Sequence, residues 1–266
     1  MLALTNRRSR NRCLAIMALF ASAQIVSGCD LPNDLWDSGQ HPPVHVEWLV
    51  DRTPSWPRSA LAAALSEARR LCESLQPGDR LTIRYIADRS YSAQEVVTQV
   101  HLNPPVVLGG LPSPAAIRQR RADSAATSEV IRQGCSRIPA AHEVPMAPRT
   151  DITSALAAAS GSLRTPGGYR RILILSSDLE ETESPGSVKL NLGSVIVRLF
   201  AVETKRGRLA DLERSIASWR ERLMGWGAAD VQLIPPGGTL AADLDRGATQ
   251  PINNESGNTV GGRKAP

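Results

Sequence analysis

Two apolar segments of this chain each end in an aspartate, and each has the length of a single β-strand. Residues 44–50 precede Asp51, and residues 172–177 precede Asp178. The second segment is a continuous apolar run, which is typical of a strand that is buried on both faces of a parallel sheet. If these two strands are parallel neighbours, both carboxylates lie at one edge of the sheet, which is where ligands bind in open α/β folds.

Helical and strand-like segments alternate along the rest of the chain. The spacing of apolar residues and the capping residues predict helices over 61–75, 114–135, 151–163, 209–226 and 239–244. Alternating or β-branched segments predict further strands at 80–87, 95–102, 195–202 and 230–234. The segment 95–102 is expected at an antiparallel edge, and Pro104 and Pro105 end it. This alternation predicts a doubly wound, mostly parallel α/β sheet with helices on both faces.

Hydroxyl groups accompany the two strand-end aspartates. Thr53 and Ser55 follow Asp51 at alternate positions, and Thr150 stands before the start of a later helix. All of these groups are oxygen donors, which suit a hard cation such as Mg²⁺. Ser55 and Pro57 also predict a helix start, with Ser55 as the N-cap and Pro57 in the first turn. The alternative to a cation site is a plain strand–turn–helix junction in which Asp51 and Ser55 serve only as caps.

The three segments together resemble the von Willebrand factor A family. The matching residues are Asp-x-Thr-x-Ser at 51–55, Thr150 before Asp-Ile-x-x-Ala-Leu, and a strand that ends in Asp178. The resemblance spans roughly residues 44–247 and implies the family's metal-ion-dependent adhesion site. It implies that Mg²⁺, or Mn²⁺ or Ca²⁺, is held by Asp51, Thr53, Ser55, Thr150 and Asp178. The family prefers serine where Thr53 stands and usually has glycine where Leu179 stands.

The resemblance implies a protein-binding module, not an enzyme, in which the ion captures an acidic side chain of a protein partner. Two alternatives remain open. The first is a scaffold that keeps the fold without a metal. The second is a Mg²⁺-dependent hydrolase similar to haloacid dehalogenase-type phosphatases, with Asp51 as nucleophile. Those phosphatases place a second aspartate two residues after the first, where this chain has Thr53.

The N-terminal residues resemble a bacterial lipoprotein signal. Four arginines precede an apolar stretch at 14–23, and Val26-Ser-Gly-Cys29 resembles a lipobox. We expect a signal peptide at 1–28, acylation of Cys29 and a tether at 29–43, which places the protein on a membrane, on its periplasmic or extracytoplasmic side. Asp30 after the acylated cysteine resembles an inner-membrane retention signal. Ordinary signal cleavage and an uncleaved anchor are the alternatives.

The charge of the chain argues against nucleic acid as a partner. The formal net charge is +5, and four of the positive charges are arginines of the predicted signal peptide. The balance without them is near neutral, whereas nucleic-acid-binding domains are strongly basic. A cluster of Arg118, Arg120 and Arg121 is expected to be a solvated helix face, with contact to acidic lipid or to an acidic partner as the alternative.

Two cysteines remain beyond Cys13 and Cys29 of the leader segment. Cys72 and Cys135 would form a disulfide in an oxidising compartment, or Cys72 would stay a buried free thiol on the apolar face of its helix. The C-terminal residues 248–266 are rich in Asn, Gly, Thr and Pro, and we expect them to be disordered.

Overall fold

The computed structural model describes residues 43–88, 90–104, 113–166, 168–182, 190–203, 209–235 and 238–240. The chain divides into two units, Met1–His41 and Pro42–Pro266, and every described element belongs to the second. The predicted signal peptide, Cys29, the C-terminal tail, and most of both the tether and the 239–244 helix lie outside the described residues. No helix within the described ranges is long and apolar enough to cross a membrane.

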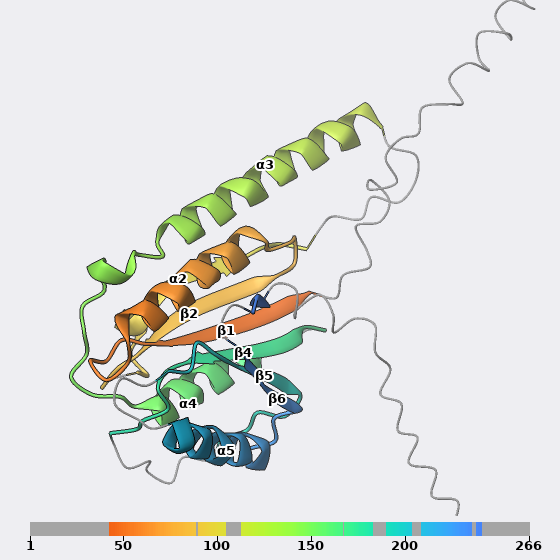
Figure 1. The fold of residues 1–266 in the computed structure, drawn as a ribbon. Coiled ribbons are helices and arrows are strands. Elements are labelled where there is room, and N and C mark those ends of the chain that lie inside the picture. Colours follow the sequence, from red (N-terminus) through yellow and green to blue (C-terminus); the bar gives the residue numbers. More distant parts are fainter. Residues whose placement is uncertain are drawn as a thin grey trace, which may run out of the picture. The chain divides into compact units, whose positions relative to one another are not determined.

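A six-stranded sheet forms the centre of the domain, with the strand order β3-β2-β1-β4-β5-β6 (Figure 1). The strands are β1 (Val44–Asp51), β2 (Arg80–Ile86), β3 (Val96–His101), β4 (Arg170–Ser176), β5 (Val195–Phe200) and β6 (Asp230–Ile234). All neighbouring pairs are parallel except β2 and β3. The predicted sheet and its antiparallel edge strand are therefore confirmed. The order reverses between β1 and β4, which is the topological switch point at which such sheets bind ligands.

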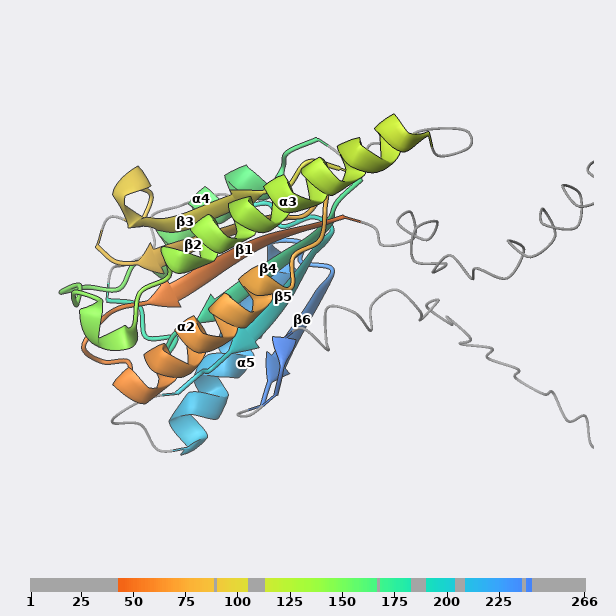
Figure 2. The ribbon, with the colours of Figure 1, turned by 90° about the horizontal axis from the view of Figure 1, so that it is seen from above.

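Helices cover both faces of this sheet, as the sequence predicted (Figures 1 and 2). The pair α2 (Arg58–Glu73) and α3 (Pro114–Ser136) lies on one face, and α4 (Ile152–Leu163) and α5 (Leu209–Gly225) lie on the other. Two short 3₁₀ helices, η3 (Ala93–Glu95) and η4 (Ala141–Glu143), belong to the connections. This two-sided covering makes the central strand β1 buried along its whole length.

The core consists of two apolar layers, one on each side of the sheet. Val46, Trp48 and Val50 pack with the residues of α2, whereas Leu49 packs with those of α4. This is the period-2 alternation of a strand with two buried faces. The polar end of Trp48 is satisfied inside the core, because its indole nitrogen donates to Ser176 Oγ over 3.0 Å.

One predicted helix cap is wrong. Ser55 does not cap α2; Pro57 is the residue before the helix, in an extended conformation, and no side chain caps this end. The Ser55 hydroxyl instead lies 3.1 Å from Thr53 Oγ1. Two other helices do begin at side-chain caps: Ser113 accepts from Ala116 N in α3, and Asp151 accepts from Ser154 N in α4.

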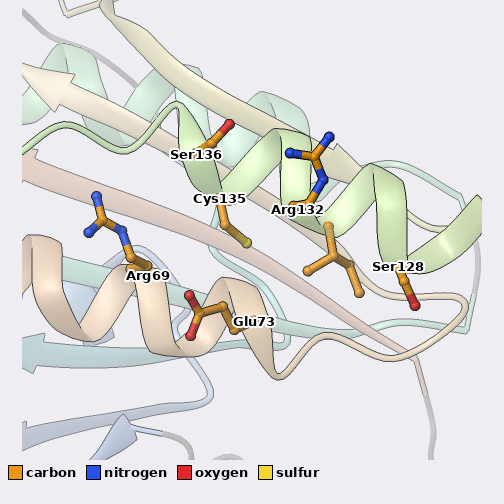
Figure 3. A pocket seen from close by; sticks show the side chains of 7 residues that line it. Arg69, Glu73, Ser128, Arg132, Cys135 and Ser136 are labelled. Carbon is orange, nitrogen blue, oxygen red and sulfur yellow. The ribbon is translucent and has the colours of Figure 1, made fainter.

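A disulfide joins Cys72 of α2 to Cys135 of α3, with 5.7 Å between the two Cα atoms. The sequence left a buried free thiol open as the alternative, and the structure contains the bridge. An open groove of about 470 Å³ runs between the two helices beside it (Figure 3). Next to the bridge, the backbone of Gly134 packs so closely on β3 that a Cβ atom there would lie 2.2 Å from Val100 Cγ2. The C-terminal part of α3 is thus fixed on the domain.

Removing the disulfide should destabilise the domain without changing its fold. The bridge spans a sequence separation of 63 residues, and the chain-entropy model gives about 4 kcal/mol for a loop of this size. We expect Cys72→Ala/Cys135→Ala to lower the free energy of unfolding by this amount in urea titrations. Wild type should lose as much when reductant is added, and the double variant should not respond to reductant. A wild-type unfolding midpoint that reductant leaves unchanged would contradict the stabilising role.

Candidate metal centre

The pairing of β1 with β4 brings the predicted site together. Val50 of β1 is in register with Ser176 of β4, so both strands end at the same edge. Asp51 is the last residue of β1, and Asp178 follows two residues after the end of β4. Both side chains are almost fully buried, with 0% and 1% exposure.

Three hydroxyl groups from two distant segments form a chain beside these carboxylates. The Thr150 hydroxyl, just before α4, donates to Thr53 Oγ1 over 3.1 Å. Thr53 Oγ1 is in turn 3.1 Å from Ser55 Oγ. Thr53 and Thr150 are 97 residues apart in the sequence, so the contact that the resemblance implied is made by the tertiary fold.

Both carboxylate oxygens of Asp51 are hydrogen-bonded. Oδ1 accepts from the backbone N–H of Thr53 over 2.8 Å, and Oδ2 accepts from Ser177 Oγ over 2.6 Å. Burial raises the pKa of Asp51 to about 6, although the hydrogen bonds from Ser177 and Thr53 act to lower it; the negative charge of Asp178 adds to the increase. Asp51 therefore organises the turn as well as bringing charge to the site.

Asp178 has one satisfied and one unsatisfied oxygen. Oδ1 accepts from the backbone N–H of Glu180 over 3.0 Å, whereas Oδ2 is buried without a hydrogen-bond partner among the described residues. A buried, unpartnered carboxylate oxygen is costly unless a cation or a water molecule compensates it. This atom is the clearest local indication that a positive ion belongs at the site.

The sequence analysis missed Ser177, which connects the two carboxylates. Its hydroxyl donates to Asp51 Oδ2 and lies 3.5 Å from Asp178 Oδ1, while it accepts the backbone N–H of Leu179. The only signal in the sequence was a second hydroxyl immediately before the strand-end aspartate. That signal is weak, because the geometry depends on how the turn after β4 folds.

Leu179 stands where the von Willebrand factor A family usually has glycine, and neighbouring contacts stabilise the turn that it forms. Its φ of 62° lies in the left-handed region, which costs a non-glycine residue about 1 kcal/mol or more. Two contacts offset this cost: the side chain is buried in the core layer of α4 and α5, and Trp219 Nε1 donates to the Leu179 carbonyl over 3.0 Å. The turn therefore keeps the conformation that glycine would favour.

The loop after Asp178 holds the start of α4 in place. Thr182 N donates to the Thr150 carbonyl and Thr182 Oγ1 accepts from Thr150 N. Glu181 Oε1 accepts from Thr153 N over 2.8 Å. Glu181 therefore binds the N-terminus of α4, where the helix dipole favours a negative charge.

The residues present fit a hard divalent cation. Within the described part of the chain, no group of three or more His, Cys, Asp or Glu side chains could hold a metal ion. A cation here would therefore use the hydroxyls of Thr53, Ser55 and Thr150 with the two aspartates, directly or through water. This is the donor set of a Mg²⁺-type site and not of a zinc site.

The raised pKa of Asp51 predicts a pH dependence of stability in metal-free protein. The carboxyl ionises at 3.8 in the reference state and at about 6 when folded, so the folded state holds the proton over this window. The contribution of Asp51 to the free energy of unfolding is then fully present below pH 3.8 and decreases by about 3 kcal/mol as the pH rises through about 6. The Asp51→Asn side chain cannot ionise, so this variant should lack the pH-dependent change in the free energy of unfolding. Urea unfolding in EDTA from pH 3.5 to 7 measures it; a constant difference between the two proteins would contradict it.

Comparisons with known proteins find likeness only among solved structures. No family model and no curated protein matches the chain. An aerotolerance-related membrane protein from Bacteroides fragilis is 14% identical with a TM-score of 0.37, over 77% of this chain and 98% of that one. A von Willebrand factor type A protein from Catenulispora acidiphila is also 14% identical with a TM-score of 0.37, over 78% of this chain and 42% of that one.

A third similar structure is the manganese-loaded TRAP protein of Plasmodium vivax, which is 14% identical with a TM-score of 0.32, over 80% of this chain and 66% of that one. At this level of likeness, what these proteins bind does not carry over to this chain. The chain's own structure confirms the predicted doubly wound α/β fold, with its sheet order and its antiparallel edge strand, and the Thr150–Thr53 and Ser177–Asp51 hydrogen bonds join the three motif segments.

Proposed function

We propose that this chain is a membrane-anchored protein-binding module that uses a Mg²⁺-type ion at the carboxyl edge of its sheet to capture an acidic side chain of a partner. The observation that carries the proposal is the Thr150–Thr53–Ser55 hydroxyl chain beside two buried carboxylates. Hydroxyls and carboxylates from three separate segments meet at the switch point of the sheet. Residues in loops at such a point can bind a ligand while the strands and helices hold the core together.

Each residue has a distinct role in this proposal. Thr53, Ser55 and Thr150 supply neutral oxygens, and Asp51 and Asp178 supply the negative charge. A bound Mg²⁺, Mn²⁺ or Ca²⁺ would supply an electrophilic centre for a carboxylate of the partner. The hydroxyls that would contact the ion directly carry no charge, so the ion would stay electrophilic towards an anionic ligand from outside.

The contacts of Asp51 favour binding over catalysis. Its carboxylate is 0% exposed and both of its oxygens accept hydrogen bonds. A nucleophile for phosphoryl transfer needs an accessible oxygen within reach of the substrate, and the second acid of a phosphatase-like pair is replaced by Thr53. A metal-free scaffold remains the alternative, and metal titration separates it from the proposal.

Thr150→Val should weaken divalent-ion binding by at least about tenfold, because it removes one oxygen donor and keeps the shape of the side chain. The matched control is Thr82→Val, which removes a buried hydroxyl of β2 that has no hydrogen-bond partner among the described residues. Calorimetric titration with Mg²⁺ and Mn²⁺ measures the affinities. Equal affinity in Thr150→Val and wild type would contradict the ligand assignment, and no binding by wild type at millimolar metal would favour the metal-free scaffold.

Partner capture should depend on the same ion. We expect wild type to retain a partner from cell extract in Mg²⁺ and to lose it in EDTA, whereas Thr150→Val should retain it poorly under both conditions. Free acetate at high concentration should compete, because it offers the same carboxylate. Capture that is insensitive to EDTA would place the partner-binding surface elsewhere on the domain.

The membrane anchor rests on the sequence pattern, since Cys29 lies outside the described residues. Labelled palmitate should enter the wild-type protein, and Cys29→Ser should abolish labelling and leave the signal peptide uncleaved or release the protein from membranes. Immunoblots of membrane and soluble fractions give the second readout. A wild-type protein that never incorporates palmitate would rule the lipid anchor out.

A further inference from the structure

Arg52, which stands between two residues of the candidate metal centre, contacts two other segments of the domain. Its carbonyl accepts the backbone N–H of Ala147 over 2.9 Å, and its guanidinium Nη1 donates to the Pro145 carbonyl over 3.0 Å. The other terminal nitrogen, Nη2, donates to Glu95 Oε1 over 2.9 Å. One residue thus joins the turn after β1 to the segment before α4 and to η3.

The segment before α4 leads from these contacts to a candidate ligand of the metal ion. Thr150 ends the segment 145–150, and its hydroxyl donates to Thr53 Oγ1 over 3.1 Å. Thr53 is the residue after Arg52. The segment is therefore joined to the turn after β1 at both of its ends, by Arg52 at one end and by the two threonine hydroxyls at the other.

The ion pair of Arg52 and Glu95 is largely shielded from water. The exposed fractions of the two side chains are 16% and 10%. The guanidinium also lies over the ring of Tyr85, 5.4 Å from its centroid. Burial raises the pKa of Tyr85 to about 12, while Arg52 acts to lower it and Glu95 to raise it. Tyr85 is thus neutral at physiological pH, and Glu95 is the carboxylate that pairs with the charge of Arg52.

The stability of the fold does not account for this polar cluster. Arg52 Nε, Glu95 Oε2 and Tyr85 Oη are buried without a hydrogen-bond partner among the described residues. Buried polar atoms without partners cost free energy, and a shielded ion pair is often no more stabilising than apolar residues of similar volume. Departures of this kind from ordinary core packing are characteristic of functional positions.

We propose that Arg52 is a positioning residue of the candidate metal centre and acts together with Glu95. The pair fixes the segment 145–150, which keeps the Thr150 hydroxyl in place to bind a cation. The inference rests on the proposed metal-dependent function and adds to it a residue that does not contact the ion. A guanidinium suits this role, because its planar fork donates to two acceptors in a fixed geometry. Glu95 also offsets the positive charge, which by itself would disfavour a cation nearby.

Arg52→Gln distinguishes a positional role from an electrostatic one. Removal of a positive charge raises the affinity for a cation if only charge matters, whereas loss of a residue that orients metal ligands lowers metal affinity by about 10- to 100-fold. We therefore expect Arg52→Gln to bind Mg²⁺ and Mn²⁺ at least about tenfold more weakly than wild type in calorimetric titrations. Glu95→Gln is a second variant that should also bind more weakly, since it breaks the same ion pair.

The matched control is Arg198→Gln. Arg198 of β5 is 5% exposed and donates to Asp230 Oδ2 over 2.8 Å, so this variant breaks a comparable ion pair. Asp230 is the first residue of β6, at the amino edge of the sheet and therefore opposite the metal centre. Its metal affinity should equal that of wild type, and circular dichroism verifies that all the variants are folded.

Hydrogen exchange in EDTA measures the positioning without any metal. Amide exchange reports local opening of a segment. The segment 145–150 should lose protection in Arg52→Gln and in Glu95→Gln, and it should exchange as in wild type in Arg198→Gln.

Unchanged or tighter metal binding by Arg52→Gln would overturn the proposal, because it would show that the charge of Arg52 matters and its contacts do not. Weaker binding with unchanged exchange of the segment 145–150 would also overturn it. These outcomes differ from a failure of the proposed function. If wild type itself binds no divalent ion, both proposals fail, whereas equal binding by wild type and Arg52→Gln removes the positioning role alone.

Discussion

The candidate site depends on the parallel pairing of β1 with β4. This pairing places Asp51 and the turn after Ser176 at one edge, and the Ser177–Asp51 hydrogen bond then joins the two strand ends. Thr150 reaches the same place because the loop after Asp178 holds the start of α4 through Thr182. Without this register, the three polar segments would have no reason to meet.

Burial gives the site its chemical character. Asp51 and Asp178 are shielded from water, so their charges are costly unless they are compensated. Both carboxylate oxygens of Asp51 accept hydrogen bonds, whereas Asp178 keeps one oxygen without a partner among the described residues. A hard cation would satisfy that oxygen and draw on the adjacent hydroxyls. A purely structural junction would leave this buried oxygen of Asp178 uncompensated.

Most of the fold could be predicted from the sequence, because periodicity and apolar runs report burial directly. The strands, the edge position of β3 and the helices on both faces follow from such patterns. Contacts that depend on turn geometry could not be predicted. Ser55 has the sequence of an N-cap but contacts Thr53, and Ser177 bridges two aspartates. Glu181 resembles a solvated loop residue, yet it binds the N-terminus of α4.

The central claim is that hydroxyls from two segments and the strand-end carboxylates bind one divalent cation. The most direct measurement is anomalous diffraction from crystals soaked in Mn²⁺. We expect a single strong peak at the carboxyl edge of the sheet, within coordination distance of oxygens of Thr53, Ser55 and Thr150, about 2.0–2.3 Å for such an ion. A peak elsewhere on the domain, or no peak at this edge at saturating Mn²⁺, would contradict it.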